Sequence, residues 1–242
     1  YHTESKRDSD IMKKGYYAAC TYIDHQLRLV IGTLREQGIL DDTIILFTAD
    51  HGEMLGTNHL HGKFLMYENS VKIPFILSPT ADSGMCCSRE DDRIVELRDV
   101  MPTLLTLAGI EVPEFVEGRS LTEEWDREYT YGELWEDDRA TRMIRTKEWK
   151  LIYYCTGNFF QLFHIKNDPD ELVDLAGHPE YKKIQEYLTE RLIENLYGQD
   201  KLLVKDGKLV GLPAKKYDFN ASLADGNKLF QGRDMLLQRG IR

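Results

Sequence analysis

Residues 43–56 read TIILFTADHGEMLG, and this stretch decides the fold class that we expect. Residues 43–48 form an unbroken apolar and β-branched run, which is typical of a strand buried on both faces and hence of a parallel strand in an α/β sheet. In open α/β sheets, ligands and catalytic groups gather beyond the carboxyl ends of the strands. The residues that follow this strand, Asp50 and His51, are therefore candidates for a functional site.

Asp50 and His51 can each offer one ligand to a divalent cation if a tight turn points both side chains the same way, and Gly52 permits such a turn. Carboxylate oxygen suits hard cations, whereas imidazole nitrogen suits transition metals, so the pair leaves the metal undecided. The alternative interpretation is structural, with Asp50 capping the following turn and His51 forming a local hydrogen bond. Taken alone, the dipeptide favours this structural interpretation.

A second group of candidates follows at residues 58–63, which read NHLHGK. Lys63 carries a compact positive charge that suits a sulfuryl or phosphoryl oxygen. His59 and His61 can donate to an anionic oxygen or transfer protons near neutral pH. The alternatives are two solvated loop histidines and an ordinary surface lysine.

Hydrophobic periodicity and turn residues predict the remaining elements. They are helices at 12–37, 99–108 and 178–196, a second strand at 73–78, an antiparallel meander at 129–163 and a hairpin at 202–210 around Asp206-Gly207. Asp99 is expected to cap the middle helix, with Pro102 in its first turn. The α/β pattern ends near residue 120, after which an antiparallel sheet packs with a helix.

The composition excludes several classes of function. The 242 residues include 31 Lys and Arg against 41 Asp and Glu, and the formal net charge of -10 argues against a nucleic-acid binder and against attraction to an anionic membrane. No apolar run approaches the roughly 20 residues of a membrane span. The 4 cysteines show no C-x-x-C spacing, so we expect free thiols rather than a zinc ribbon or a disulfide framework.

Taken in order, several segments resemble the sulfatases of the alkaline phosphatase superfamily. Residues 42–56 resemble the family's metal-binding strand and loop, and Lys63 lies in a stretch like its G-K…Y-E…[RK]-[VI]-P pattern. Further similar segments are 99–105, 118–121, 142–154 and 161–176, the last of which contains a D-P-x-E turn at 168–171. The resemblance covers about residues 12–198.

This resemblance implies an α/β fold class. Part of an alkaline-phosphatase-like mixed or parallel sheet with helices would be followed by a smaller antiparallel sheet packed with a C-terminal helix. Residues 1–122 would be the C-terminal part of the α/β catalytic domain, and residues 123–242 a C-terminal α+β subdomain with a tail.

The resemblance also implies roles for single residues. Asp50 and His51 would be two ligands of a divalent cation, which in sulfatases is usually Ca2+, with Mn2+ or Zn2+ as alternatives. Lys63 would contact the sulfate oxygens and neutralise charge on the leaving oxygen. The family often carries a histidine shortly before this lysine, but an alignment without gaps places Asn58 there. His59 and His61 are therefore candidates for substrate binding.

One essential part of a sulfatase has no match in the sequence. The family makes its formylglycine nucleophile from Cys or Ser in a C-x-P-S-R or S-x-P-S-R motif, and residues 86–89, CCSR, are the nearest string but lack the proline. The family's first metal-binding aspartates are also absent. The resemblance therefore implies the C-terminal half of such an enzyme, with formylglycine expected in the missing N-terminal half and no turnover by the chain alone.

Three hypotheses on function remain. The first is a fragment of a sulfatase that acts on a small-molecule sulfate ester. The second is a phosphonate monoester or phosphodiester hydrolase of the same superfamily, because sulfuryl and phosphoryl groups are both tetrahedral anions. The third is a non-catalytic interaction module that keeps the fold, against which Asp50, His51 and Lys63 argue because packing alone does not need them. A homo-oligomer and a cytoplasmic or periplasmic location are left open.

Aromatic residues of the meander could flank the organic part of a substrate. They are Trp135, Tyr153, Tyr154, Phe159 and Phe160. Aromatic residues in a sheet are more often part of the core, so this remains a list of candidates.

Overall fold

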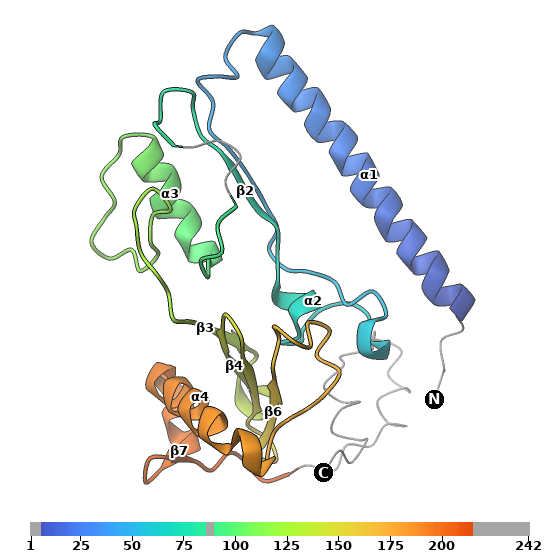
Figure 1. Cartoon of the computed structure of the whole chain (residues 1–242), viewed down its shortest axis with the longest axis vertical. Coiled ribbons are helices and arrows are strands. Elements are labelled where there is room, and N and C mark those ends of the chain that lie inside the picture. The colour runs from blue at the N-terminus through green and yellow to red at the C-terminus, as the bar shows by residue number, and fades with distance from the viewer. Residues whose placement is uncertain (1–5, 86–89, 215–242) are drawn as a thin grey trace. The chain divides into compact units, whose positions relative to one another are not determined.

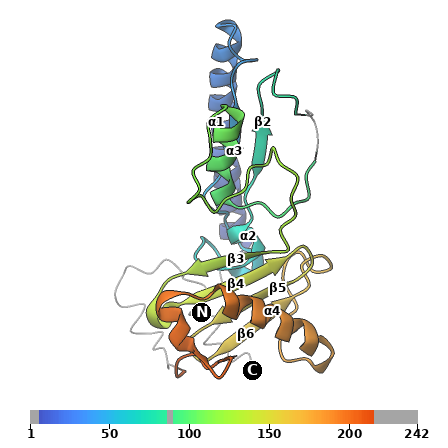
Figure 2. The same ribbon diagram turned by 90° about the vertical axis from the view of Figure 1, so that its left-hand side faces the viewer.

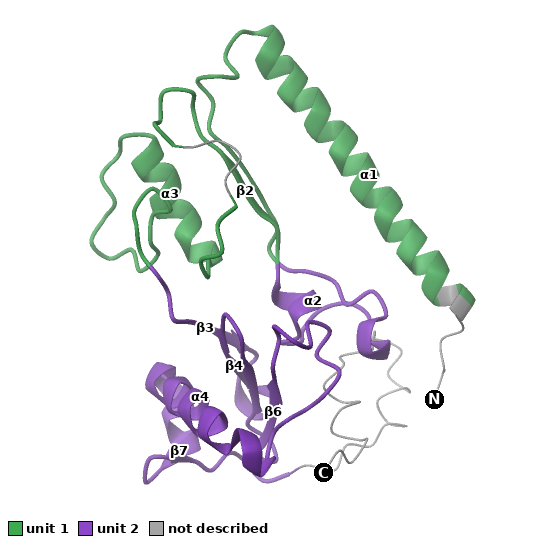
Figure 3. Cartoon of the chain, in the orientation of Figure 1, with its two compact units in different colours: residues 1–50, 73–125 green, residues 51–72, 126–242 purple. Residues whose placement is uncertain are grey.

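The computed structural model describes residues 6–85 and 90–214. The chain divides into two compact units, here called unit 1 (residues 1–50 and 73–125) and unit 2 (residues 51–72 and 126–242), which Figure 3 shows in different colours. The CCSR string at 86–89 and the predicted tail beyond residue 214 lie outside the described residues.

Unit 1 contains two α-helices and a two-stranded sheet (Figure 1). Its elements are α1 (Lys6–Glu36), β1 (Ile45–Thr48), β2 (Phe75–Ser78), the 3₁₀ helix η2 (Leu97–Asp99) and α3 (Val100–Leu107). These elements confirm the helices and strands predicted for this part of the sequence. None of the described helices is both long enough and apolar enough to cross a membrane.

The pairing of the first strand differs from the expectation. β1 and β2 run antiparallel, with Ile45 opposite Ser78 and Thr48 opposite Phe75. The prediction of a parallel strand buried on both faces is wrong for this pair, and the β1 side chains are half-buried. An apolar run does not specify the direction of the neighbouring strand. Burial of a strand on both faces requires a packed layer on either side of its sheet.

The apolar stripe of α1 is exposed. The sequence places Met12, Tyr16, Ile23 and Val30 on one face at helical spacing, which predicts burial. In the structure these four side chains are 45%, 41%, 53% and 59% exposed. The predicted helix is thus confirmed, whereas the predicted burial of these four side chains is wrong.

The start of α3 joins two of the segments that resemble sulfatases. The buried carboxylate of Asp99 accepts hydrogen bonds from the backbone N–H groups of Glu96 and Arg119, each at 2.8 Å. The prediction that Asp99 caps α3 through its side chain is wrong, because that carboxylate is used by the preceding 3₁₀ turn and by the chain at Arg119. Pro102 lies in the first turn of α3, as predicted.

Unit 2 is built on a four-stranded antiparallel sheet whose strand order follows the sequence (Figure 2). Its elements are η1 (Thr57–His59), α2 (Glu68–Val71), β3 (Tyr129–Leu134), η3 (Asp137–Arg139), β4 (Thr141–Thr146), β5 (Lys150–Tyr154), β6 (Phe159–Phe163), η4 (Pro179–Tyr181), α4 (Lys182–Asn195), η5 (Gly198–Leu203), β7 (Val204–Lys205) and β8 (Lys208–Leu209). The predicted meander, helix and hairpin are confirmed. In the hairpin turn, Asp206 has φ +50° and Gly207 has φ +72°, as a type I′ turn requires.

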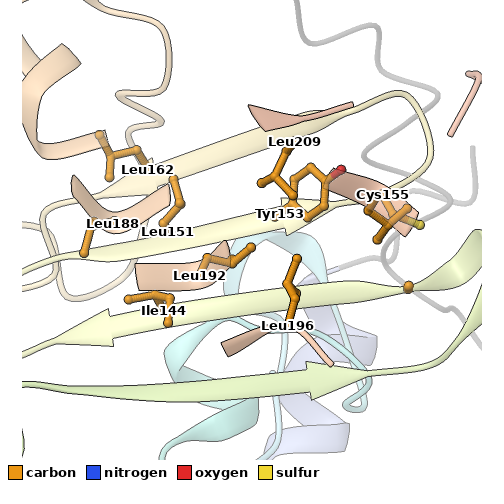
Figure 4. Close-up of a cluster of buried hydrophobic side chains, with 11 residues drawn as sticks. Ile144, Leu151, Tyr153, Cys155, Leu162, Leu188, Leu192, Leu196 and Leu209 are labelled. Carbon is orange, nitrogen blue, oxygen red and sulfur yellow. The ribbon is translucent and has the colours of Figure 1, made fainter. Parts of the chain in front are cut away.

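One face of this sheet packs on α4. Alternate residues of a strand point to opposite faces, and Leu151 and Tyr153 of β5 point toward the helix. Figure 4 shows them among Leu188, Leu192 and Leu196 of the helical segment, and all five residues belong to one buried cluster. Burial of each such side chain contributes about 1.5–3 kcal/mol, so this layer is a main source of stability for unit 2.

The other face of the sheet packs on residues 54–67. Ile152 and Tyr154 of β5 point to this side, where they form a second buried cluster with Met54 and Met66. Residues 54–67 are far from the meander in sequence. Their contact with the sheet explains why residues 51–72 belong to unit 2, although the strand that precedes them belongs to unit 1.

Candidate functional site

Segment 51–72 carries four of the five predicted site residues. His51, His59, His61 and Lys63 lie on this segment of unit 2, whereas Asp50 is the last residue of the first of the two segments that make up unit 1. Asp50 and His51 are both exposed directly after β1, where the sequence places them. The structure thus collects three histidines and one lysine on a single loop that the antiparallel sheet supports.

Gly52 lies at a close approach between two backbone segments. Its N–H donates to the carbonyl oxygen of Ser70 at 2.8 Å. A Cβ atom on Gly52 would lie 2.1 Å from the carbonyl oxygen of Asn69 and 3.1 Å from that of Lys72. The glycine is therefore needed for space beside α2, and not for the tight turn that the sequence suggested.

Glu53 closes the loop that follows. Its carboxylate accepts hydrogen bonds from the backbone N–H groups of Leu55, at 3.3 Å, and Gly62. The N–H of Met54 donates to the carbonyl oxygen of Gly62 at 2.9 Å, next to this contact. These bonds join the two ends of the loop, so its two histidines are held in a closed turn whose base is the buried Met54.

The two histidines of the closed loop flank one buried residue, Leu60. Leu60 is 3% exposed, while His59 on one side of it is exposed and His61 on the other is half-buried. His59 has φ +59°, in the left-handed region that is uncommon for residues other than glycine. Lys63 is half-buried, and its Nζ lies 5.7 Å from the centroid of the Phe64 ring.

A buried charge network, here called the Lys150 network, holds the chain just after Lys63. The side chain of Lys150 is 0% exposed, and its Nζ lies 2.6 Å from Glu68 Oε1 and 2.8 Å from Glu171 Oε1. The same Nζ donates to the carbonyl oxygen of Met66 at 2.9 Å. Arg145 adds a second cation, 3.2 Å from Glu68 Oε2. The network therefore binds α2, β4, β5 and the D-P-x-E turn together.

The two carboxylates of this network have pKa values shifted in opposite directions. Burial would raise the pKa of Glu68, but Lys150 and Arg145 outweigh it and lower the pKa below its ordinary value. Burial raises the pKa of Glu171, and Lys150 offsets this only in part. Burial also raises the pKa of Tyr67 to about 12, so its hydroxyl stays protonated beside Gln161.

The two donors that are expected to bind a divalent cation follow β1. Asp50 offers carboxylate oxygens, and His51 Nδ1 lies 2.9 Å from the carbonyl oxygen of Gly52. Because a carbonyl oxygen only accepts, this contact requires the proton on Nδ1 and places the lone pair of the neutral ring on Nε2, as in most metal-binding histidines. Within residues 6–85 and 90–214 no group of three or more His, Cys, Asp or Glu side chains could hold a metal.

Known proteins resemble this chain over most of its length. An arylsulfatase of Clostridium perfringens is 33% identical over 241 residues, which cover 95% of this chain and 45% of that protein. The structure of BT4656 in complex with its substrate D-glucosamine-2-N,6-O-disulfate is 28% identical, with a TM-score of 0.63, over 74% of this chain and 39% of that one. The phosphonate monoester hydrolase SpPMH of Silicibacter pomeroyi is 27% identical, with a TM-score of 0.64, over 71% of this chain and 38% of that one.

These likenesses confirm the α/β fold class and define a class of hydrolases that act on sulfate or phosphonate esters. The family model for N-sulphoglucosamine sulphohydrolase, C-terminal, matches residues 56–197, and the chain therefore belongs to the sulfatase family as a C-terminal region. The matched residues include Lys63 and the whole antiparallel sheet. The chain spans less than half the length of each of these three relatives.

The structure also shows structural contacts of residues that the sequence did not single out. Glu53 looks like a surface acid in the sequence but closes the loop of the histidines. Lys150 looks like one of many exposed lysines but is fully buried. The signal for the Lys150 network was present, because Glu68 and Glu171 both lie in segments that resemble sulfatases, but their contact could not be read from either segment alone.

Proposed function

We propose that this chain is the C-terminal part of a metal-dependent hydrolase of small-molecule sulfate esters. One observation carries the proposal: the family match runs from residue 56 to residue 197, across the loop that bears Lys63 and the sheet that supports it. Unit 1 would contribute to the α/β catalytic domain predicted for residues 1–122. The sheet and α4 of unit 2 would form the subdomain predicted for residues 123–242.

Each polar side chain then has a role in the complete enzyme. Asp50 and His51 Nε2 would hold a divalent cation, taken as Ca2+ with Mn2+ or Zn2+ as alternatives, and such a cation polarises the sulfate group. Lys63 would contact the sulfate oxygens and neutralise the charge that develops on the leaving oxygen. His59 and His61 would bind substrate or exchange protons with it.

The remaining parts of the site would come from outside these 242 residues. This chain covers 45% of the arylsulfatase of Clostridium perfringens. A segment that corresponds to the rest of that relative would supply the formylglycine nucleophile and further metal ligands. The same segment would cover the exposed apolar stripe of α1. One additional segment would thus account for both the exposed face of α1 and the incomplete metal site.

In the complete enzyme, Lys63→Ala is expected to lower kcat for p-nitrophenyl sulfate by about 10²–10³-fold, because one preorganised positive charge at the leaving oxygen is lost. Lys205→Ala, at the exposed position of β7, is the matched control and should leave kcat unchanged. The purified 242-residue chain is expected to show no turnover. Unchanged kcat in the Lys63→Ala enzyme, or turnover by the chain alone, would contradict the proposal.

Calorimetric titration of the chain with Ca2+ is expected to show weak binding, with Kd on the order of 10⁻³ M, because the described residues offer two ligands. Asp50→Ala and His51→Ala should each abolish this binding, whereas the exposed Asp82→Ala control should retain it. Parallel titrations with Mn2+ and Zn2+ decide which cation the pair prefers. Identical binding by the Asp50→Ala variant would favour the non-catalytic module instead.

The likeness to a phosphonate monoester hydrolase favours one second candidate function. Hydrolysis of phosphonate monoesters would use Lys63 in the same way, because both substrates carry a tetrahedral anion. The ratio of kcat/KM for p-nitrophenyl sulfate and for p-nitrophenyl phenylphosphonate in the complete enzyme separates the two candidates.

A further inference from the structure

The predicted sulfate-binding lysine is the first of four side chains that contact one another in turn. They are Lys63, Phe64, Trp135 and Arg139. The Nζ of Lys63 lies 5.7 Å from the centroid of the Phe64 ring, and that ring lies 5.3 Å from the ring of Trp135. On Trp135, in turn, the guanidinium carbon of Arg139 lies 4.6 Å from the ring centroid. All four residues belong to unit 2.

Phe64 is turned away from the core that its neighbours enter. Leu65 and Met66 are buried against the sheet, whereas Phe64 is 41% exposed. Its backbone has φ +70°, and Trp135 has φ +59°. This left-handed region is unusual for bulky side chains and disfavoured by sterics, and such residues gather where ligands bind. The backbone thus holds two large rings together outside the buried cluster.

We propose that Phe64, supported by Trp135, forms the wall on which the ring of the substrate's organic part stacks. This inference rests on the proposed function, because it takes Lys63 as the contact of the sulfate group. In an aryl sulfate a single oxygen separates the sulfur from the ring. The 5.7 Å between Lys63 Nζ and the Phe64 ring therefore allows one molecule to meet both groups.

The charges around the two rings further define the substrate class. Arg139 lies against Trp135, so each end of the pair of rings carries a positive charge, Lys63 beside Phe64 and Arg139 beside Trp135. Both charges favour an anionic substrate over a neutral one. The substrate that fits is thus a ring that carries a sulfate group.

Binding of sulfate esters to the chain tests the wall directly, because the proposed function gives the chain no turnover. Isothermal titration with p-nitrophenyl sulfate and with methyl sulfate compares a ring with a methyl group on the same anion. We expect the aryl ester to bind more tightly. Phe64→Ala should weaken its binding about tenfold, since an aromatic pair contributes up to roughly 1.5 kcal/mol. Binding of methyl sulfate should not change.

Three further variants sharpen the comparison. Phe115→Ala removes a phenylalanine that is 80% exposed in unit 1 and should bind both esters like the unmodified chain. Phe64→Leu keeps apolar bulk without a ring and should bind the aryl ester with intermediate affinity. Trp135→Ala should weaken the aryl ester alone, because the support of Phe64 is lost. Circular dichroism verifies that each variant is folded.

The outcomes separate this inference from the proposed function. Equal binding of the two esters, or an aryl ester that is insensitive to Phe64→Ala while Lys63→Ala weakens both, would overturn the wall and leave the sulfate contact in place. Loss of aryl binding in Phe64→Ala with no effect of Lys63→Ala would contradict the proposed function. Absence of binding of either ester overturns both.

Discussion

Lys150→Met is expected to lower the free energy of unfolding by about 3–5 kcal/mol, because it leaves buried charges without their partner. Lys150 Nζ contacts Glu68 Oε1 at 2.6 Å, Glu171 Oε1 at 2.8 Å and the carbonyl oxygen of Met66 at 2.9 Å. Methionine has similar length and fills the space, so the loss would come from the electrostatic and hydrogen-bonding partners rather than from a cavity. Urea unfolding followed by circular dichroism measures the difference.

The exposed ion pair of Lys166 with Glu148 provides the control for this prediction. Lys166 Nζ lies 2.6 Å from Glu148 Oε1, a distance equal to that between Lys150 and Glu68, but both side chains are largely exposed. Lys166→Met should therefore lower the free energy of unfolding far less than Lys150→Met does. If both lysine variants lower the free energy of unfolding by the same amount, burial is not the reason for the large effect of Lys150→Met.

The second large effect is expected for Gly52→Ala, which should lower the free energy of unfolding by about 3 kcal/mol and displace the loop after β1. The added Cβ would lie 2.1 Å from the carbonyl oxygen of Asn69, and this obstacle is backbone rather than a movable side chain. Relief of the clash requires the Gly52 N–H to separate from the Ser70 carbonyl, which it contacts at 2.8 Å. Overpacking of this kind usually costs 1–3 kcal/mol, and the loss of a backbone hydrogen bond adds to it.

Gly15→Ala is the matched control and should have the opposite sign. Gly15 lies inside α1, and a Cβ there meets nothing within 4 Å. Alanine in a helix interior is favoured over glycine by roughly 0.5–1 kcal/mol, so this variant should be slightly more stable. A Gly52→Ala protein that unfolds at the same urea concentration as the unmodified chain would show that α2 can move away at little cost.

The parts of the fold that the sequence predicts correctly are those that depend on neighbours in the chain. Apolar spacing locates α1 and α4, short runs rich in aromatic residues and broken by polar turns locate the meander, and Asp206-Gly207 locates the β7–β8 turn. Each of these signals lies within a few residues of the structure that it specifies. The antiparallel pairing of β1 does not follow from the sequence, because hydrophobicity indicates burial but not the direction of the neighbouring strand.

The candidate site shows the same division. The sequence locates Asp50 and His51 just after β1, and Lys63 on the segment that follows. It could not show that the loop of Lys63 lies against β5, because Glu68 and Lys150 are 82 residues apart. Charged residues are usually exposed, so neither residue signals by itself that it belongs to a buried pair.

The two faces of the unit 2 sheet differ in how far their partners lie along the chain. The face on α4 is built from residues that follow the meander closely, whereas the other face needs residues 54–67. Contacts between nearby residues form faster than distant ones, because closing a long loop costs more entropy. The meander and α4 should therefore assemble first, and the segment that delivers Lys63 should dock last, as the step that completes folding of the unit.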